Sequence, residues 1–124
     1  MVEVFSGLPL DRQTEMDLKA SDLAKNLIGA VRTSLGRDWK SARHLAEPEL
    51  RRLSRSLADI GKLASNGQIT LEEAQSLVRI HRNTTAMVLL AVRGLGLLAV
   101  ENAINSAMDA VRQTVNTATG LRLL

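Results

Sequence analysis

The sequence NGQITLEE at residues 66–73 is the clearest local signal for secondary structure in this chain. Asn66 and Gly67 suit a left-handed residue at the end of one helix, where glycine carries no steric penalty. Thr70 suits the N-cap of the next helix, and Glu73, three residues later, completes a capping box. The stretch therefore predicts a tight turn between two helices.

Upstream of this turn, residues 38–65 carry the apolar stripe of an amphipathic helix. At 100° per residue the stripe falls within about 80° of arc, and it consists of Trp39, Ala42, Ala46, Leu50, Leu53, Leu57, Ile60 and Ala64. The stripe keeps its phase across Pro48, which predicts one helix kinked at the proline or two collinear pieces. A further amphipathic helix is predicted for residues 11–35, with Gly36 as its C-cap, and residues 1–10 are expected to form an extended arm.

Downstream of the turn, the helical pattern changes direction. Residues 86–100 are apolar nearly all round, and the stripe that follows them is rotated by about 100° from the stripe that precedes them. A break at Arg93-Gly94-Leu95-Gly96 gives a helical hairpin, and with it an antiparallel bundle of four helices within residues 11–120. The alternative is two helices plus one long helix over residues 71–119. The break is favoured because it gives four helices of similar length, followed by a short tail at residues 121–124.

The apolar segment 86–100 predicts self-association in either arrangement. Soluble monomers rarely expose a contiguous apolar patch, so we expect a homo-oligomer that completes the bundle. The side chains expected to pack against a second subunit are Leu89, Leu90, Leu97 and Leu98. Membrane insertion is disfavoured, because a spanning helix needs about 20 apolar residues and Arg93 interrupts this shorter run.

The composition is that of a single small helical domain. Of the 124 residues, 45% are hydrophobic, and Phe5 and Trp39 supply the aromatic side chains. Cysteine is absent, which excludes disulfides, thiolate nucleophiles and cysteine zinc sites. Residues 1–10 contain no lysine or arginine and do not resemble a secretory signal, so a cytoplasmic protein is expected.

The sequence offers no set of residues for a metal or for catalysis. Di-iron bundles use Glu-x-x-His pairs, whereas His44 and Glu47 show the reverse spacing. His81 lies on an apolar helix face, where a hydrogen-bonded core or interface histidine is the favoured interpretation. No nucleophile motif or phosphate-binding loop occurs. We therefore expect no enzymatic activity and no cofactor, and a ferritin-like metal enzyme is disfavoured.

The most functional-looking feature is a basic face on the segment that precedes the turn. Opposite the apolar stripe, within about 120°, lie His44 and the possible anion-binding residues Arg37, Lys40, Arg51, Arg52, Arg55 and Lys62. Glu47, Glu49 and Asp59 flank the face, and no tyrosine or phenylalanine is there to stack on bases. A solvated or salt-bridged face is therefore the favoured interpretation.

These features predict a non-enzymatic structural or interaction protein that self-associates through apolar helix faces. The alternative is a nucleic-acid-binding accessory protein that uses the basic face. The formal net charge of +3 permits an anionic partner but is small for a chain of 124 residues.

Overall fold

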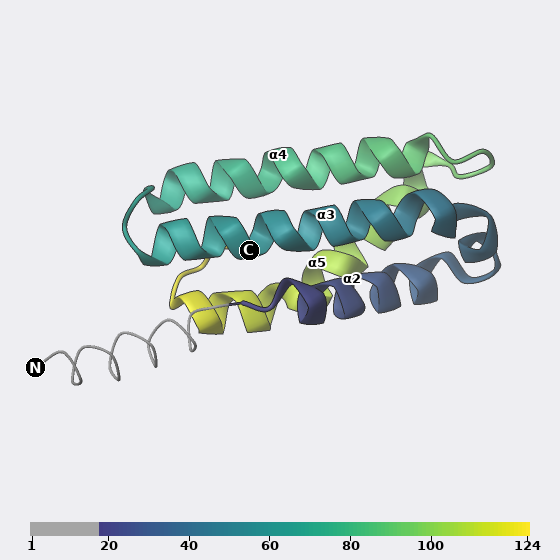
Figure 1. The fold of residues 1–124 in the computed structure, drawn as a ribbon. Helices are drawn as coiled ribbons and strands as arrows, with labels where there is room; N and C mark the ends of the chain where they lie inside the picture. Colours follow the sequence, from purple (N-terminus) through teal and green to yellow (C-terminus); the bar gives the residue numbers. More distant parts are fainter. Residues whose placement is uncertain (1–17) are drawn as a thin grey trace, which may run out of the picture.

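Within residues 18–124, four α-helices follow one another in up-and-down order. The computed structural model describes residues 18–124, and within them the elements are α2 (Ala20–Leu35), the 3-10 turn η1 (Gly36–Asp38), α3 (Trp39–Ser65), α4 (Leu71–Leu90) and α5 (Leu97–Thr119), with no strand. Successive helices are antiparallel, and α5 crosses behind α3 to end beside α2 (Figure 1). The predicted all-α bundle is confirmed. The predicted arm at residues 1–10 and the predicted helical residues 11–17 lie outside the described part of the chain. Leu18 and Lys19 were also expected to be helical, but they precede α2, with Lys19 as its extended N-cap.

The turn between α3 and α4 has the predicted chemistry. The Thr70 hydroxyl accepts a 3.0 Å hydrogen bond from the Glu73 amide, and the Thr70 amide donates a 2.8 Å bond to the Glu73 carboxylate. Gly67 takes a φ of 75°, a left-handed value that favours glycine. These local groups satisfy backbone donors that the first turn of α4 would otherwise leave unpaired. They hold α3 and α4 as antiparallel neighbours.

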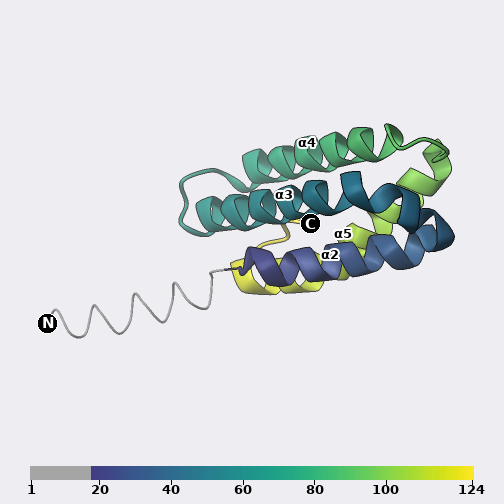
Figure 2. The same ribbon diagram turned by 45° about the vertical axis from the view of Figure 1, so that its right-hand side comes forward.

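The chain also turns between α4 and α5, so residues 71–119 are two helices rather than one. α4 ends at Leu90, Gly94 takes a φ of 92°, and extended Gly96 caps the start of α5. Figure 2 shows this loop at the end of the bundle, with α5 turning back from it. Because α4 and α5 approach the core from different directions, each needs its own apolar stripe. The turn therefore explains the rotation between the two stripes.

One apolar core lies among the four helices. Its largest fully buried side chains come from every helix and include Leu27, Leu53, Leu89, Val100 and Val111. Burial of one such side chain stabilises the fold by about 1.5–3 kcal/mol. α3 continues through the exposed Pro48 as a single helix, which excludes two separate pieces. Because the inner faces of the helices are buried in this core, contacts with other molecules would be made by the outer faces.

Candidate functional site

Large apolar side chains on both sides of the α4–α5 turn are exposed to solvent. Leu90 is 40% exposed at the end of α4, and Leu97 and Leu98 are 60% and 71% exposed at the start of α5. Met87, one turn earlier in α4, is also exposed. We call Met87, Leu90, Leu97 and Leu98 the hairpin patch. Leu89 does not belong to it, because this side chain is 0% exposed inside the chain's own core.

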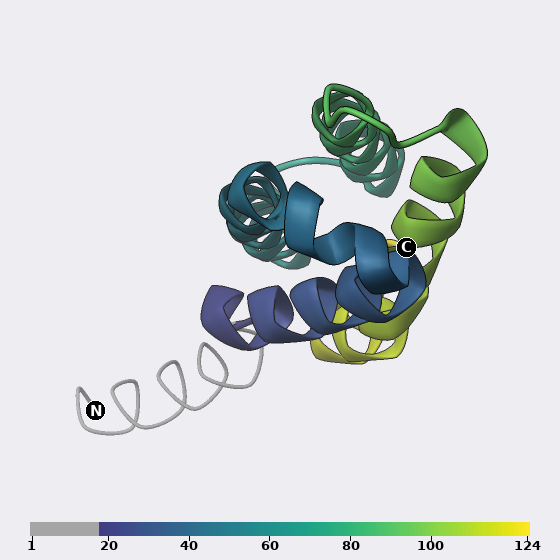
Figure 3. The ribbon, with the colours of Figure 1, turned by 90° about the vertical axis from the view of Figure 1, so that its right-hand side faces the viewer.

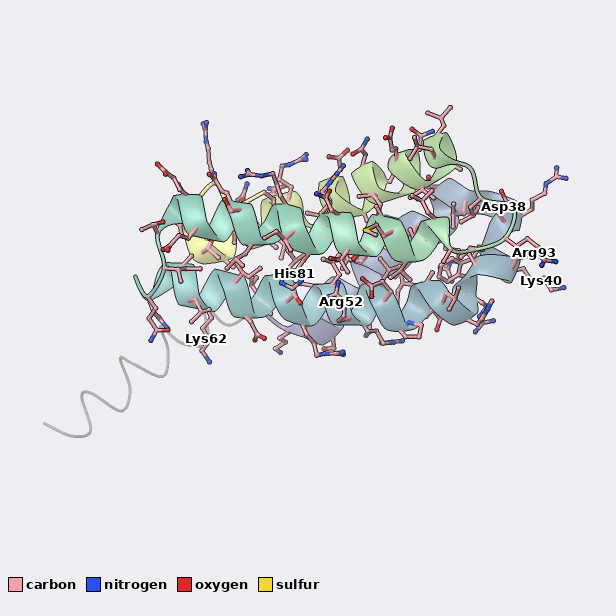
Figure 4. All side chains as sticks on the ribbon, turned by 90° about the horizontal axis from the view of Figure 1, so that it is seen from above. Asp38, Lys40, Arg52, Lys62, His81 and Arg93 are labelled. Atoms are coloured by element: carbon pink, nitrogen blue, oxygen red, sulfur yellow. The ribbon has the colours of Figure 1, made fainter. Side chains whose placement is uncertain are left out.

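The local sequence leaves the hairpin patch with little charge around it. Residues 83–100 contain one charged side chain, Arg93, which lies at the tip of the turn. Figure 4 shows Arg93 at the same end of the bundle as Asp38 and Lys40. The patch is thus an apolar surface at an end of the bundle that carries charged groups of both signs.

The basic face of α3 keeps five of its six expected residues in solvent. The five exposed residues are Arg37 of η1 and Lys40, Arg51, Arg55 and Lys62 of α3. No ion pair joins any of them to an acidic side chain within residues 18–124. Figure 4 shows Lys40 and Lys62 near opposite ends of α3. At 1.5 Å per residue, they are separated by about 33 Å along the helix. The cations follow a line along the surface and do not converge on one point.

Arg52 departs from the expected anion-binding face. Its Nε and Nη2 donate hydrogen bonds of 2.9 and 2.7 Å to the two carboxylate oxygens of Glu49, and its Nη1 lies 3.1 Å from Nδ1 of His81. The Arg52 side chain, held by these contacts, is half-buried between α3 and α4. The helical wheel places Arg52 at the edge of the basic face, where a second helix can cover it. Arg52 is therefore a structural residue.

The Glu49 carboxylate is the centre of a buried polar network. The residue is 8% exposed, and Glu49 Oε2 also accepts a 2.7 Å hydrogen bond from the hydroxyl of fully buried Thr85. Burial by itself raises the pKa of Glu49, but the hydrogen bonds from Arg52 and Thr85 outweigh it and hold the pKa below its ordinary value. The same ion pair raises the pKa of Arg52. The network joins α3 to α4 through charged and hydroxyl groups.

The sequence predicts only part of this polar network. The half-buried His81 ring does contact a polar partner between two helices, in keeping with the predicted role of a hydrogen-bonded core or interface histidine. Glu49, which was expected to flank the basic face, is buried between the helices. The i, i+3 spacing of Glu49 and Arg52 is a local signal for their pairing. No local signal joins Glu49 to Thr85, since these residues belong to different helices.

The described residues show neither a metal-binding group nor a membrane span. Within residues 18–124, no three histidine, aspartate or glutamate side chains gather as metal ligands do, and His44 lies exposed. None of the helices in this part of the chain is both long enough and apolar enough to cross a membrane. Comparison of the chain with protein families, with curated proteins and with solved structures gave no match in any of the three.

Proposed function

We propose that the protein is a non-enzymatic helical interaction protein that self-associates through the hairpin patch. The observation that carries the proposal is the exposure of Leu97 and Leu98, 60% and 71%, in the first turn of α5. Exposed leucines in a solvated turn lose the free energy that burial would supply, about 25 cal/mol per Å² of apolar surface. Met87 and Leu90, on the other side of the turn, are exposed as well, which supports an interface at this end of the bundle.

A second copy of the chain is the occupant that fits the patch best. The four patch side chains are apolar, so pairing the patch with itself about a two-fold axis buries apolar surface on both sides. Exposed Glu101 lies one turn beyond Leu97 and Leu98 on α5, at the border of such a contact. Such pairing leaves Arg93, at the tip of the turn, near the edge of the contact where water can reach it. The proposed assembly is accordingly a homodimer or a higher oligomer.

The size of the protein in solution tests the proposal. Light scattering after size exclusion should give a mass at least twice that of the 13.5 kDa chain at micromolar concentration. A folded protein that remains a monomer under these conditions contradicts it. The cytoplasmic location, expected because residues 1–10 do not resemble a secretory signal, remains a prediction, which cell fractionation tests separately.

A nucleic-acid-binding accessory role is the second candidate, and the exposed line of cations on α3 favours it. Lysines and arginines spaced along about 33 Å can follow successive phosphates of a nucleic acid. Fluorescence anisotropy with short DNA and RNA duplexes at low salt tests this role. The double variant Arg51→Gln, Arg55→Gln should weaken binding and reduce its salt dependence, and absence of wild-type binding to either duplex contradicts the role.

A further inference from the structure

A second basic site lies on another side of the bundle, between α4, α5 and the C-terminal tail. An open cavity of about 340 Å³ is lined there by Arg79 and Arg82 of α4, Arg112 of α5, and Arg122 of the tail. No acidic side chain is among its lining residues. We call this cavity the arginine groove. It is separate from both the hairpin patch and the basic face of α3.

The fold fixes the backbone positions from which these four arginine side chains extend. Gln75, Arg79 and Arg82 repeat at the i, i+4, i+7 spacing that places them on one side of α4, and this side faces α5. The Gln75 side-chain amide donates a 2.8 Å hydrogen bond to the Arg122 carbonyl, which ties the tail to α4. Arg122 therefore projects from an anchored segment.

A second anchor holds the tail to α5. Asn116 Oδ1 accepts hydrogen bonds of 3.0 Å from the amides of both Leu123 and Leu124, and Leu123 is 3% exposed. Figure 3 shows residue 124, marked C, between α4 and α5. The tail is thus part of the packed structure and forms a wall of the groove.

Three of the four arginines have no direct acidic partner within residues 18–124, although Leu124, which carries the carboxylate at the end of this chain, also lines the groove. Arg112 forms a 2.6 Å ion pair with Asp109, whereas Arg79 donates to the Ser76 hydroxyl and Arg82 to the side-chain oxygen Oδ1 of Asn105. No ion pair joins Arg79, Arg82 or Arg122 to a carboxylate of residues 18–124. Arginine stays protonated under all ordinary conditions, so these like charges repel one another unless an anion lies between them.

We propose that the arginine groove binds a phosphate monoester that carries an apolar group. Guanidinium groups that approach from three segments can contact several oxygens of one tetrahedral phosphate, whose charge is close to −2 at neutral pH. Val78, Met108 and Leu123 supply apolar wall beside the cations and suit the organic part of such a ligand. No aromatic side chain lines the groove to stack on a base, which favours a small ester over a nucleic acid.

Calorimetric titration with hexyl phosphate tests the proposal. Hexyl phosphate should bind the wild-type protein more tightly than inorganic phosphate, because of the apolar wall, and more tightly than hexanoate, because of its charge and its third oxygen. The double variant Arg79→Gln, Arg122→Gln should bind it at least about tenfold more weakly. Arg51→Gln, Arg55→Gln removes the same charge from α3 and should leave the affinity unchanged within about twofold.

Several outcomes would overturn the assignment. They are no heat of binding at millimolar hexyl phosphate, an equal loss of affinity in the two double variants, or hexanoate binding as tight as that of hexyl phosphate. A short RNA that binds more tightly and loses affinity in the same groove variant would replace the small ester with a nucleic acid. Unchanged circular dichroism and thermal melting confirm that the variants fold.

The source of the ester is resolved by a vesicle experiment. Co-sedimentation with vesicles containing phosphatidic acid, reversed by hexyl phosphate, would identify a lipid headgroup as the bound group. Hexyl phosphate binding without co-sedimentation would identify a soluble monoester. Both results support the groove as a phosphate site. The self-association proposal stands or falls separately, because light scattering on the groove variant measures it without any ligand.

Discussion

The Thr85 hydroxyl of α4 donates a 2.7 Å hydrogen bond to Glu49 Oε2 of α3, across a sequence separation of 36 residues. The same hydroxyl lies 3.1 Å from the His81 carbonyl of its own helix. With Arg52 bound to the other side of the carboxylate, Glu49 is satisfied although it is buried. Within the network, the Thr85–Glu49 hydrogen bond joins α3 to α4 through two buried side chains, whereas the contact between Arg52 and His81 is half-buried.

Replacing Thr85 with valine tests the contribution of this hydrogen bond to stability. Valine keeps the shape of the side chain but removes a donor from a buried carboxylate, which should lower the free energy of unfolding by about 1–3 kcal/mol. The exposed Thr84 provides a matched control, since its hydroxyl bonds the Ile80 carbonyl in solvent. Thr84→Val should cost less than about 0.5 kcal/mol in the same urea titration. Equal costs for the two variants would contradict a structural role for the network.

The stability of the protein should fall in acid partly through Glu49. Since the pKa of this carboxyl is lower in the folded state than in the unfolded state, the folded chain binds fewer protons. The stabilisation is complete above the unfolded carboxyl pKa of about 4.3 and is lost as the pH falls through the lower folded value.

Glu49→Gln should therefore reduce the drop in unfolding free energy measured between about pH 6 and about pH 3. Glu47→Gln, which removes a partly exposed carboxylate paired with Arg43 at 3.4 Å, serves as the control and should show nearly the wild-type drop. If both variants keep the full drop, another group carries the acid sensitivity.

The two glycines of the α4–α5 turn should respond differently to alanine. Gly94 has a φ of 92°, which an L side chain rarely adopts, whereas Gly96 has a φ of −88°. Neither Cβ would meet a heavy atom within 4 Å, so backbone strain alone distinguishes them. Gly94→Ala should cost about 1–2 kcal/mol, and Gly96→Ala should be close to neutral in thermal unfolding. The reverse order would contradict the turn geometry.

Charge in the hairpin patch should separate the subunits without unfolding them. Because Leu97 and Leu98 are exposed in the single chain, Leu97→Glu, Leu98→Glu should shift the mass from oligomer to monomer and leave the circular dichroism spectrum unchanged. Leu63→Glu, at an exposed position near the other end of α3, is the control and should remain an oligomer. If the Leu63→Glu control dissociates as well, the result contradicts the assignment of the interface to the hairpin patch.

The sequence alone predicts the helical segments and the turn between α3 and α4, whereas α2 begins at Ala20 and α4 ends at Leu90, each inside the expected bounds. Thr70 and Glu73 lie three residues apart, and helix caps are made within one turn, so their pairing can be predicted from spacing alone. The apolar stripes likewise predicted which faces are buried, since a helix repeats every 3.6 residues. The break near Gly94 was predicted because glycine and the rotated stripe both pointed to it.

Only the tertiary structure shows which charged side chains face solvent and which lie close to one another. On a helical wheel Arg52 is one cation of a basic face, but α4 covers it and places His81 and Thr85 beside its Glu49 partner. Leu89 and Leu90 are neighbours in an apolar run, yet the turn buries one and exposes the other. The arginine groove brings Arg79, Arg112 and Arg122 together from three segments. Such contacts depend on how helices cross and where a tail returns, and neither is encoded in the periodicity of a single helix.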